Sequence, residues 1–590
     1  MIQMPIFLTI QAPMSFLLRI VIFFSLSIST VMAQSKVDIE ILGLSSTLEN
    51  NVRLYLSIAQ QQNHSLISDG RLHRLHRKAE QEIAAALQPY GYYRPVIVTS
   101  LDQKDSSRWK AKYQIDPGPQ LTMSEYHFYI SPGMTEDSEF QQWTKAHERQ
   151  PGSVFTHLWY ENFKSGLVKL AAEKGYRDAQ FTEHRVEIDL DAYVVRVFLR
   201  YEGGERYKFG EVLMQQNVLD NDFLMRYLTF EPGEPYLLDK LVELQQVLND
   251  TQYFKTVAVS TETPKVGSKL LPVVLNLTPR RQHRFETGVG YGTDTGARAR
   301  FGWIVPRLNR LGHHFNSVLE VSELGYKVSG NYRVPVLNPR TDQIILSLGE
   351  EFEDFEDTQT TLQTLGISLV HSRSLWRETL SINYQEEDFV SGDDQGNSRL
   401  LIPGISWSRT WGNEFINVFD GLRLDLSMRG AEKNVSSDIS FFQLSGYLKV
   451  ITPLNRRNRI ITRGEFGSTE TSEFEKLPSS VRFFAGGAQS VRGYRYQSLG
   501  PKNDDGDVVG GRHLLTGSIE YEHYFDDNWG FAVFLDAGNA IDQFNEDLEQ
   551  GAGFGFRWKS PIGLVRIDLA SAISLEGSPW RLHINIGPDL

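Results

Sequence analysis

From about residue 283 to the C-terminus, apolar and polar residues alternate with a period of two. For example, Leu380, Ile382 and Tyr384 occupy every second position and have polar neighbours between them. The same alternation occurs at residues 422–427, 565–569 and 580–586. This period is typical of β-strands that have two different faces, so the second half of the chain is expected to form a sheet.

The sheet is predicted to be a membrane barrel of about 16 strands. Beyond the N-terminal segment no run offers the roughly 18 uncharged apolar residues of a transmembrane helix, so a membrane could be crossed only by strands. A soluble β-sandwich would also alternate. However, several strands place Arg or Asp on the opposite face, as at Arg566 and Asp568, which favours a wet lumen. The 308 residues of this half, at about 19 per strand and connection, give about 16 antiparallel strands.

The N-terminus resembles a secretory signal peptide. Residues 16–30 are almost wholly apolar, and Val31-Met32-Ala33 then offers small residues where a signal peptidase reads them. We therefore expect residues 1–33 to be removed after Ala33. An uncleaved anchor is the competing interpretation, and translation from Met14 would give a conventional signal length.

The first half has helical periodicity, and its pattern occurs three times. Each copy consists of a strand, a helix, a second helix and two more strands, and the second helix has apolar residues at steps of three and four. These residues are Leu72, Leu75, Ala79, Ile83 and Ala86 in the first copy, Phe163, Leu167, Leu170 and Ala171 in the second, and Leu237, Leu241, Leu244 and Leu248 in the third. Each second helix thus has one face to bury against a sheet.

A turn with an aromatic residue follows each of these helices. The turns are Gly91-Tyr92-Tyr93, Gly175-Tyr176-Arg177 and Gln252-Tyr253-Phe254. Glycine at this place suits a helix C-cap. From the ends of the last strands we expect three α/β domains and a barrel, at residues 34–119, 120–204, 205–282 and 283–590.

This β-α-α-β-β order resembles the POTRA domain, the periplasmic module of the superfamily that contains BamA, TamA and the two-partner-secretion transporters. Two motifs are similar to the same superfamily. Residues 491–494 resemble its VRG(F/Y) loop signature, and residues 534–538 resemble its F-x-D-x-G strand motif. The resemblance implies that Arg492, on a loop folded into the barrel, pairs with the inward carboxylate of Asp536. Glu520 is a candidate second acceptor. The expected loop latch comprises Val491, Arg492, Gly493, Tyr494, Glu520, Phe534, Asp536 and Gly538.

Within the superfamily, three POTRA-like repeats without an added N-terminal plug helix resemble the TamA family, and so does the C-terminus, residues 587–590. The resemblance implies an outer-membrane location with the POTRA domains in the periplasm. It also implies an inner-membrane-anchored TamB-like partner, unfolded outer-membrane or autotransporter clients, and contact with the lipid bilayer. A two-partner-secretion transporter is an alternative, as is the outer-membrane end of a phospholipid transport system.

Composition argues against several other functions. The chain has no cysteine, so disulfides and thiolate metal sites are excluded, and neither a cofactor nor a metal is expected. The net charge is −13 and no basic stripe suits a nucleic-acid backbone. No G-x-S-x-G or H-E-x-x-H motif is present, so we do not expect an enzyme. A passive porin would explain the strands but would give the three repeats no role.

The two ends of the barrel sequence are poor at pairing. We expect the first strand to run from Phe285 to Trp303, where Gly288, Gly290 and Gly292 weaken it by roughly 0.5–1 kcal/mol each. The last strand ends at Gly587 and Pro588, and proline has no N–H for a ladder. These five residues are predicted to form a lateral gate, a weak seam that opens toward lipid.

Overall fold

The computed structural model describes residues 34–61, 67–105, 108–355, 358–391, 394–412, 418–560 and 563–587. The chain divides into two compact units between Arg206 and Tyr207, and each is described by itself. The expected signal peptide, with its cleavage after Ala33, and the expected gate residue Pro588 lie outside the described residues. Among the described residues, no helix is long and apolar enough to cross a membrane.

The first unit begins with an α/β module whose sheet has the order β2-β1-β4-β3. Its elements are β1 (Gln34–Leu42), α1 (Ser46–Tyr55), α2 (Ser57–Gln60), β2 (Ile67–Ser68), α3 (Asp69–Leu87), the 3₁₀ turn η1 (Gln88–Tyr90), β3 (Val96–Asp105) and β4 (Arg108–Asp116). The apolar face of α3 is buried at Leu72, Ala79 and Ile83, which share a core with Ala111 and Tyr113 of β4. The apolar spacing in the sequence of α3 therefore corresponds to a face of this helix that is buried in the structure.

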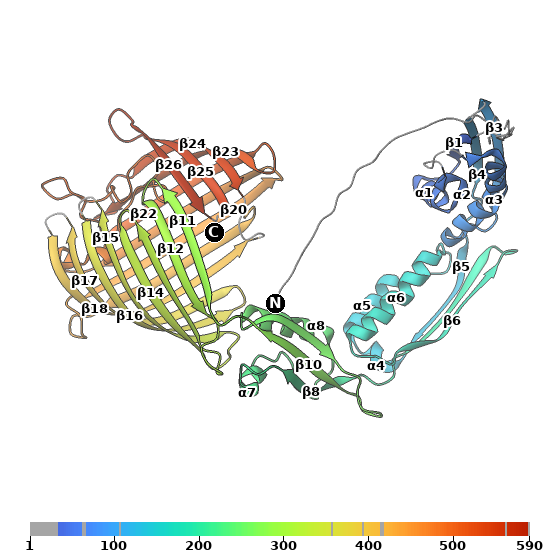
Figure 1. Ribbon diagram of the computed structural model, residues 1–590, viewed down its shortest axis with the longest axis horizontal. Helices are drawn as coiled ribbons and strands as arrows, with labels where there is room; N and C mark the ends of the chain where they lie inside the picture. Colours follow the sequence, from blue (N-terminus) through green and yellow to red (C-terminus); the bar gives the residue numbers. More distant parts are fainter. Residues whose placement is uncertain are drawn as a thin grey trace, which may run out of the picture. The chain divides into compact units, whose positions relative to one another are not determined.

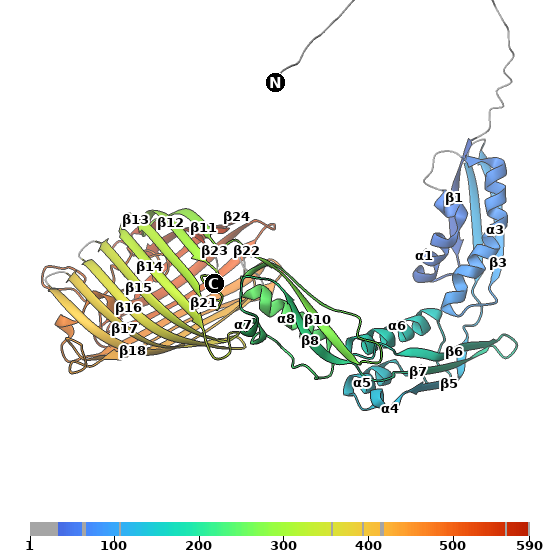
Figure 2. The ribbon, with the colours of Figure 1, turned by 60° about the horizontal axis from the view of Figure 1, so that its bottom comes forward.

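The second module of this unit has a three-stranded sheet in the order β5-β7-β6. Its elements are β5 (Thr122–Ile130), α4 (Pro132–Thr135), α5 (Ser138–His147), α6 (His157–Glu173), β6 (Gln180–Asp189) and β7 (Val194–Glu202). Helices α5 and α6 lie together beside the sheet (Figure 2). Phe163, Leu167 and Ala171 of α6 are fully buried, whereas Leu170 packs at the edge of the same core.

The second unit opens with a third module, whose sheet has the order β8-β10-β9. Its elements are β8 (Lys208–Gln215), α7 (Asn221–Met225), α8 (Leu238–Asp250), β9 (Phe254–Thr261) and β10 (Leu270–Pro279). Leu241, Leu244 and Leu248 of α8 are buried, and Leu237 directly precedes the helix. The third module has the predicted strand–helix–helix–strand–strand order, and the first two have it with short additional elements, α2 and β2 in the first and α4 in the second (Figure 1).

The turns after the long helices share one backbone conformation. Gly91, Gly175 and Gln252 all have positive φ, at 87°, 87° and 60°. This left-handed conformation ends a helix at little cost in glycine and at a higher cost in Gln252.

The third module is fixed to the barrel by buried hydrogen bonds. The Tyr253 hydroxyl donates to the carbonyl oxygen of Gly312 at 2.6 Å and lies 3.0 Å from Nε2 of His314. Arg310 and Asp220 add an ion pair at 2.7 Å. Burial strongly raises the pKa of Tyr253, so this hydroxyl keeps its proton and remains a donor.

The rest of the second unit is one antiparallel sheet of 16 strands in chain order, which confirms the expected fold and strand number. The strands are β11 (Arg284–Gly292), β12 (Gly296–Val305), β13 (His314–Ser322), β14 (Gly325–Pro335), β15 (Asp342–Phe355), β16 (Thr358–Arg373), β17 (Trp376–Ser391), β18 (Asp394–Gly412), β19 (Gly421–Ala431), β20 (Phe441–Asn455), β21 (Asn458–Glu470), β22 (His513–Tyr524), β23 (Trp529–Ile541), β24 (Glu549–Ser560), β25 (Gly563–Ala572) and β26 (Trp580–Gly587). They curl into a barrel in which β11 lies beside β26 (Figure 1).

The two faces of this sheet have opposite character. Leu348 and Leu365, on the outer face, are 63% and 62% exposed, as a lipid-facing surface requires. On the inner face Asp536 and Arg557 are fully buried. The predicted alternation of apolar and polar residues therefore corresponds to outside and lumen.

Tryptophans gather at one rim of the outer face. Because the third module leads directly into β11, odd-numbered strands run away from that module and even-numbered strands return toward it. Five exposed tryptophans lie near the module end of their strands: Trp303, Trp376, Trp411, Trp529 and Trp558. A sixth, Trp580, lies at the opposite end, at the start of β26. Trp529 and Trp558 stack with ring centroids 5.2 Å apart. Such rings mark the interfacial level of a bilayer.

One expectation about the barrel was wrong. The segment from Phe285 to Trp303 is not a single strand but the hairpin of β11 and β12, paired from Arg284 with Ile304 to Gly292 with Gly296. Thr293, Asp294 and Thr295 form its turn, and Gly296 follows with φ of 66°. A short turn flanked by two glycines reverses the chain here, where alternation alone suggested continuity.

Candidate functional site

The loop between β21 and β22, residues 471–512, carries the VRGY sequence and is called the VRGY loop below. Its base is tied to the inner wall, because the backbone N–H of Ser480 donates to Glu387 Oε1 of β17 at 3.1 Å. Within the loop, the Arg482 guanidinium donates to the carbonyl oxygens of Leu477 and Val509 at 2.7 and 2.9 Å. The loop is thus a braced structure that presents its tip to the luminal face.

At the tip, Arg492 is held by carboxylates from different strands. Its Nε and one terminal nitrogen donate to the two oxygens of Asp536 at 2.7 and 2.9 Å, which is the two-pronged geometry that suits a guanidinium. The other terminal nitrogen donates to Glu520 Oε2 at 2.6 Å. The backbone N–H of Arg492 also donates to Asp536, at 3.0 Å. The guanidinium and the backbone N–H of Arg492 therefore hold the loop tip against β23 through Asp536, and the guanidinium also holds it against β22 through Glu520.

The neighbours of Arg492 in the motif pack around this ion pair. The Phe534 ring lies under the guanidinium, 3.3 Å from its carbon to the ring centroid, which adds a cation–π contact. Val491 and Tyr494 are buried with Ala540 and Ala572 in a small apolar cluster. The Tyr494 hydroxyl donates to Glu549 Oε2 at 2.7 Å.

The two motif glycines are required by close approaches. Gly493 has φ of 99°, and a Cβ added there would lie 2.8 Å from the backbone nitrogen of Ala572. A Cβ on Gly538 would lie 2.7 Å from the carbonyl oxygen of Leu515. Such distances are not tolerated by backbone atoms, so both positions permit only glycine without a local shift. The structure thus brings all eight predicted latch residues to one region of the lumen.

A second arginine, which the sequence motifs did not indicate, completes the charge network. Arg557 of β24 is fully buried and donates to Glu520 at 2.6 Å, to Glu522 at 2.7 Å and to Asp568 at 2.5 Å. Arg459 of β21 pairs with Glu522 at 2.6 Å. Because Glu520 and Asp568 contact both Arg492 and Arg557, the loop tip joins a network that already ties β21, β22, β24 and β25 together.

Burial makes this network sensitive to the loss of any member. Removing one partner of a buried ion pair leaves an uncompensated charge and costs about 3–5 kcal/mol. The inward positions of Glu522, Arg557 and Asp568 could be identified from strand alternation. Their mutual contacts could not, because these depend on the stagger between strands.

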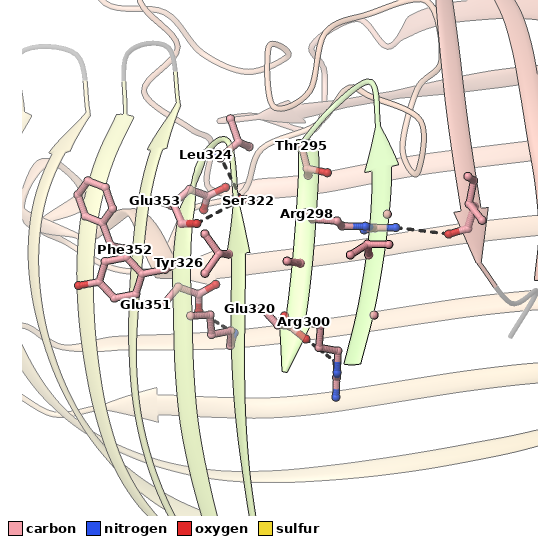
Figure 3. A pocket seen from close by; sticks show the side chains of 18 residues that line it. Thr295, Arg298, Arg300, Glu320, Ser322, Leu324, Tyr326, Glu351, Phe352 and Glu353 are labelled. Atoms are coloured by element: carbon pink, nitrogen blue, oxygen red, sulfur yellow. Dashed lines mark hydrogen bonds and ion pairs between the residues drawn. The ribbon is translucent and has the colours of Figure 1, made fainter. Parts of the chain in front are cut away.

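The first and last strands meet without a backbone ladder among the described residues. The sheet is paired continuously from β11 to β26, but these two end strands are not paired with each other. Among the described residues, two hydrogen bonds between a side chain and the backbone cross the seam. The N–H of Ile584 donates to Thr293 Oγ1 at 3.2 Å. The Arg298 guanidinium donates to the carbonyl oxygen of Ile586 at 3.4 Å, which is the dashed line from Arg298 in Figure 3.

The predicted gate residues lie on both sides of this seam. Gly288, Gly290 and Gly292 alternate with the outward residues of β11, and Gly587 ends β26. A cavity of about 420 Å³ opens beside them (Figure 3). It is lined by residues that include Gly288, Gly290, Arg298, Arg300, Glu320 and Ile586. Arg300 and Glu320 pair at 2.5 Å but remain about half exposed, unlike the buried ions around Arg492.

Among the described residues, no group of three or more His, Cys, Asp or Glu side chains is arranged to hold a metal ion. The contacts of the site join a loop to strands and one strand edge to another. The chemistry that this arrangement supports is reversible binding of a loop and of β-strand edges.

A lipid-facing 16-stranded barrel, an inward VRGY loop and repeated α/β modules define a class: outer-membrane barrels with POTRA domains. The Omp85 superfamily domain matches residues 283–588, more than half of the chain. The chain therefore belongs to the Omp85 superfamily. Its first module, residues 38–117, matches the first POTRA domain of TamA.

Two curated relatives and one solved structure are similar to this chain. The outer membrane protein assembly factor BamA of Nitratidesulfovibrio vulgaris is 24% identical over 449 residues, which cover 70% of this chain and 54% of that protein. The chain thus spans about half the length of that relative. BamA of Neorickettsia risticii is 20% identical over 537 residues, or 84% of this chain and 69% of that protein.

The structure of BamA from Haemophilus ducreyi lacking POTRA domains 1–3 is similar with a TM-score of 0.69 and 17% identity. It covers 79% of this chain and 100% of that chain. At this identity the similarity shows the fold alone.

Proposed function

We propose that this protein inserts or exports β-barrel or autotransporter clients through the seam between β11 and β26. The observation that carries the proposal is the meeting of these strands without a backbone ladder among the described residues. Among the described residues, every other neighbouring strand pair of the barrel is joined by a backbone ladder, so this is the place where opening breaks the fewest hydrogen bonds.

An open seam would present unpaired N–H and C=O groups of β11 at the edge of the barrel. Such an edge can add an incoming strand through main-chain hydrogen bonds, with little demand on the client's side chains. Within the bilayer the drive to pair is large, because unpaired backbone groups have no water to bind. The client would therefore fold by templating on the edge of β11.

In this proposal the VRGY loop is a latch and not a catalyst. Arg492, Asp536 and Glu520 hold the tip in the lumen, and Phe534, Gly493 and Gly538 shape the contact. While the tip is held, the loop fills the space beside β22–β25. Its release would make room for a client segment in the lumen.

We further propose that the protein acts with an inner-membrane-anchored, TamB-like partner, as in the TamA branch of the superfamily. The match of the first module to the first POTRA domain of TamA supports this. Purifying the tagged full-length protein from its native membrane in mild detergent should bring a large inner-membrane-anchored protein with it. Recovery of only periplasmic or outer-membrane proteins would contradict this part of the proposal.

A disulfide across the seam tests the gate directly, because the chain has no native cysteine. Thr293→Cys with Ile584→Cys is the natural pair, since the side chain of Thr293 already touches the backbone of Ile584. Oxidation should stop client assembly, and reduction should restore it. The matched control is Thr287→Cys with Phe301→Cys, which face each other in the β11–β12 ladder and should lock nothing new. A locked seam that still assembles clients would refute the gate.

A further inference from the structure

The VRGY loop touches both sides of the seam, not only the wall that binds Arg492. The backbone N–H of Ala488 donates to Asp294 Oδ2 at 2.7 Å, and Asp294 lies in the turn between β11 and β12. The backbone N–H of Gly493 donates to His583 Nε2 at 3.0 Å, and His583 lies on the luminal face of β26. Two adjacent parts of one loop thus bind the first hairpin and the last strand.

Asp294 and His583 also face each other across the seam. Asp294 Oδ1 lies 3.6 Å from His583 Nδ1. Because a backbone N–H can only donate, Nε2 of His583 must be the acceptor, and the proton of the neutral ring then resides on Nδ1. At 3.6 Å the Asp294 carboxylate is near this nitrogen but does not accept a hydrogen bond from it. The imidazole is only 2% exposed, with the loop N–H bonded to one ring nitrogen and Asp294 close to the other.

Glycines allow the loop to approach both contact points. A Cβ on Gly487 would lie 2.9 Å from Asp294 Oδ2, and Gly487 has φ of 98°. Gly493, at the other contact, has no room for a side chain against Ala572. The sequence of the loop tip is thus adapted to Asp294 and His583 as well as to Asp536.

We propose that Asp294 and His583 form a clasp through which the VRGY loop holds the seam closed, so that loop withdrawal and seam opening are one coupled event. The path from the β11–β12 turn runs through Asp294 to residues 488–493 of the loop, and from there to β26 by His583 and to the neighbouring wall by Arg492. Loss of Asp294 therefore breaks the path, and loss of His583 weakens it. The inference rests on the proposed function only for its biological purpose.

The test uses spin labels on the full-length protein in lipid vesicles. Val289→Cys and Leu582→Cys place labels on the outer faces of β11 and β26, where both side chains are exposed. In a separate sample, Gln489→Cys, an exposed position of the loop tip, is paired with Leu582→Cys to report loop withdrawal. Distance distributions then give the open fraction of the seam and the position of the loop.

Asp294→Ala and His583→Ala should each raise the open fraction roughly 3- to 10-fold, the effect of losing one or two net hydrogen bonds. The double variant should open no further than the stronger single variant, because loss of the Asp294 contact already detaches the loop from the β11–β12 turn. Asp294→Asn provides a variant of nearly unchanged shape if Asp294→Ala folds poorly. Asn585→Ala, two residues along the same inward face of β26, is the matched control and should leave both distances unchanged.

Three results would overturn the clasp: unchanged distances in the single variants, fully additive effects in the double variant, or a wider seam with the loop label unmoved. Failure of the proposed function is distinguishable from failure of the clasp. The clasp variants could open the seam while client assembly responds neither to these variants nor to the seam disulfide. That result would support the clasp and would refute the proposed gate function.

Discussion

The last strand, β26, has two neighbours and binds them in different ways. On one side eight residue pairs form an antiparallel ladder with β25, behind which Arg557 and Asp568 join the buried ion network. On the other side, among the described residues, only hydrogen bonds between a side chain and the backbone cross to the β11–β12 hairpin, next to a cavity of about 420 Å³ with half-exposed charges. The interactions that stabilise this barrel are therefore concentrated on the β25 side of β26. The proposed opening lies on its β11 side.

The strongest test of that contrast compares two luminal arginines. Arg557→Ala removes a fully buried partner of three carboxylates and should lower the free energy of unfolding by about 3–5 kcal/mol. Arg300→Ala, beside the seam, breaks a half-exposed pair with Glu320 and should cost about 0–1 kcal/mol. Urea-dependent unfolding of the barrel in lipid vesicles measures both. Equal losses would mean that the two walls do not differ as described.

Arg492→Lys should have the next largest effect. The change keeps the positive charge but loses the two-pronged contact with Asp536, so the loop tip should be held less firmly by about 1–3 kcal/mol. Proteolysis of the loop in intact vesicles reports this as faster cleavage within residues 471–512. Lys502→Ala, an exposed change on the same loop, is the control. A lysine variant as protected as the original protein would show that charge alone holds the latch.

Gly493→Ala should weaken the loop contact by about 1–2 kcal/mol, because a left-handed backbone and a 2.8 Å approach to Ala572 both penalise a Cβ. The loop should shift away from β25 and β26 while the ladder between those strands survives. Amide hydrogen exchange distinguishes the two regions. Gly506→Ala, at positive φ but with open space around its Cβ, controls for backbone strain alone.

The smallest expected effect is a stabilisation on the weak side. A Cβ on Gly288 would meet only the Cβ of Arg300, at 4.0 Å, so Gly288→Val fits and should stiffen β11 by about 0.5–1 kcal/mol. Client assembly should slow by a few-fold because β11 would leave its resting position less readily. The same change at Gly517, which lies in the middle of the paired wall with open space around it, should leave assembly unchanged. Faster assembly in Gly288→Val would contradict a gate at this strand.

The fold could be predicted because periodicity is a local property of the sequence. Contacts between distant strands could not be predicted from this periodicity. Alternation around Leu380 and helical spacing around Leu241 each report one buried or lipid-facing side, which is a local property. The β11–β12 hairpin was missed because its glycines continue the alternating pattern on either side of the turn at Thr293 to Thr295.

The candidate site was predictable where a motif or strand alternation indicated the partners. The resemblance suggested Arg492 with Asp536, and the polar face of its strand suggested Glu520 as a second acceptor. The structure places all three within hydrogen-bonding distance. The network around Arg557 and the meeting of Asp294 with His583 depend on how the sheet closes. Strand tilt and stagger decide which inward residues face each other across such a closure, and no local pattern encodes these.

The tryptophans near the module end of the barrel have a consequence for its depth in the bilayer. Rings such as Trp529 and Trp558 anchor that rim at the level of the lipid headgroups. A bilayer that becomes thinner or thicker must then adjust mainly at the opposite rim. The turn that carries Asp294 lies at that opposite rim. We therefore expect a change in bilayer thickness to act mainly at the end of the seam that the loop holds together, where Trp580 is the one exposed tryptophan among the described residues.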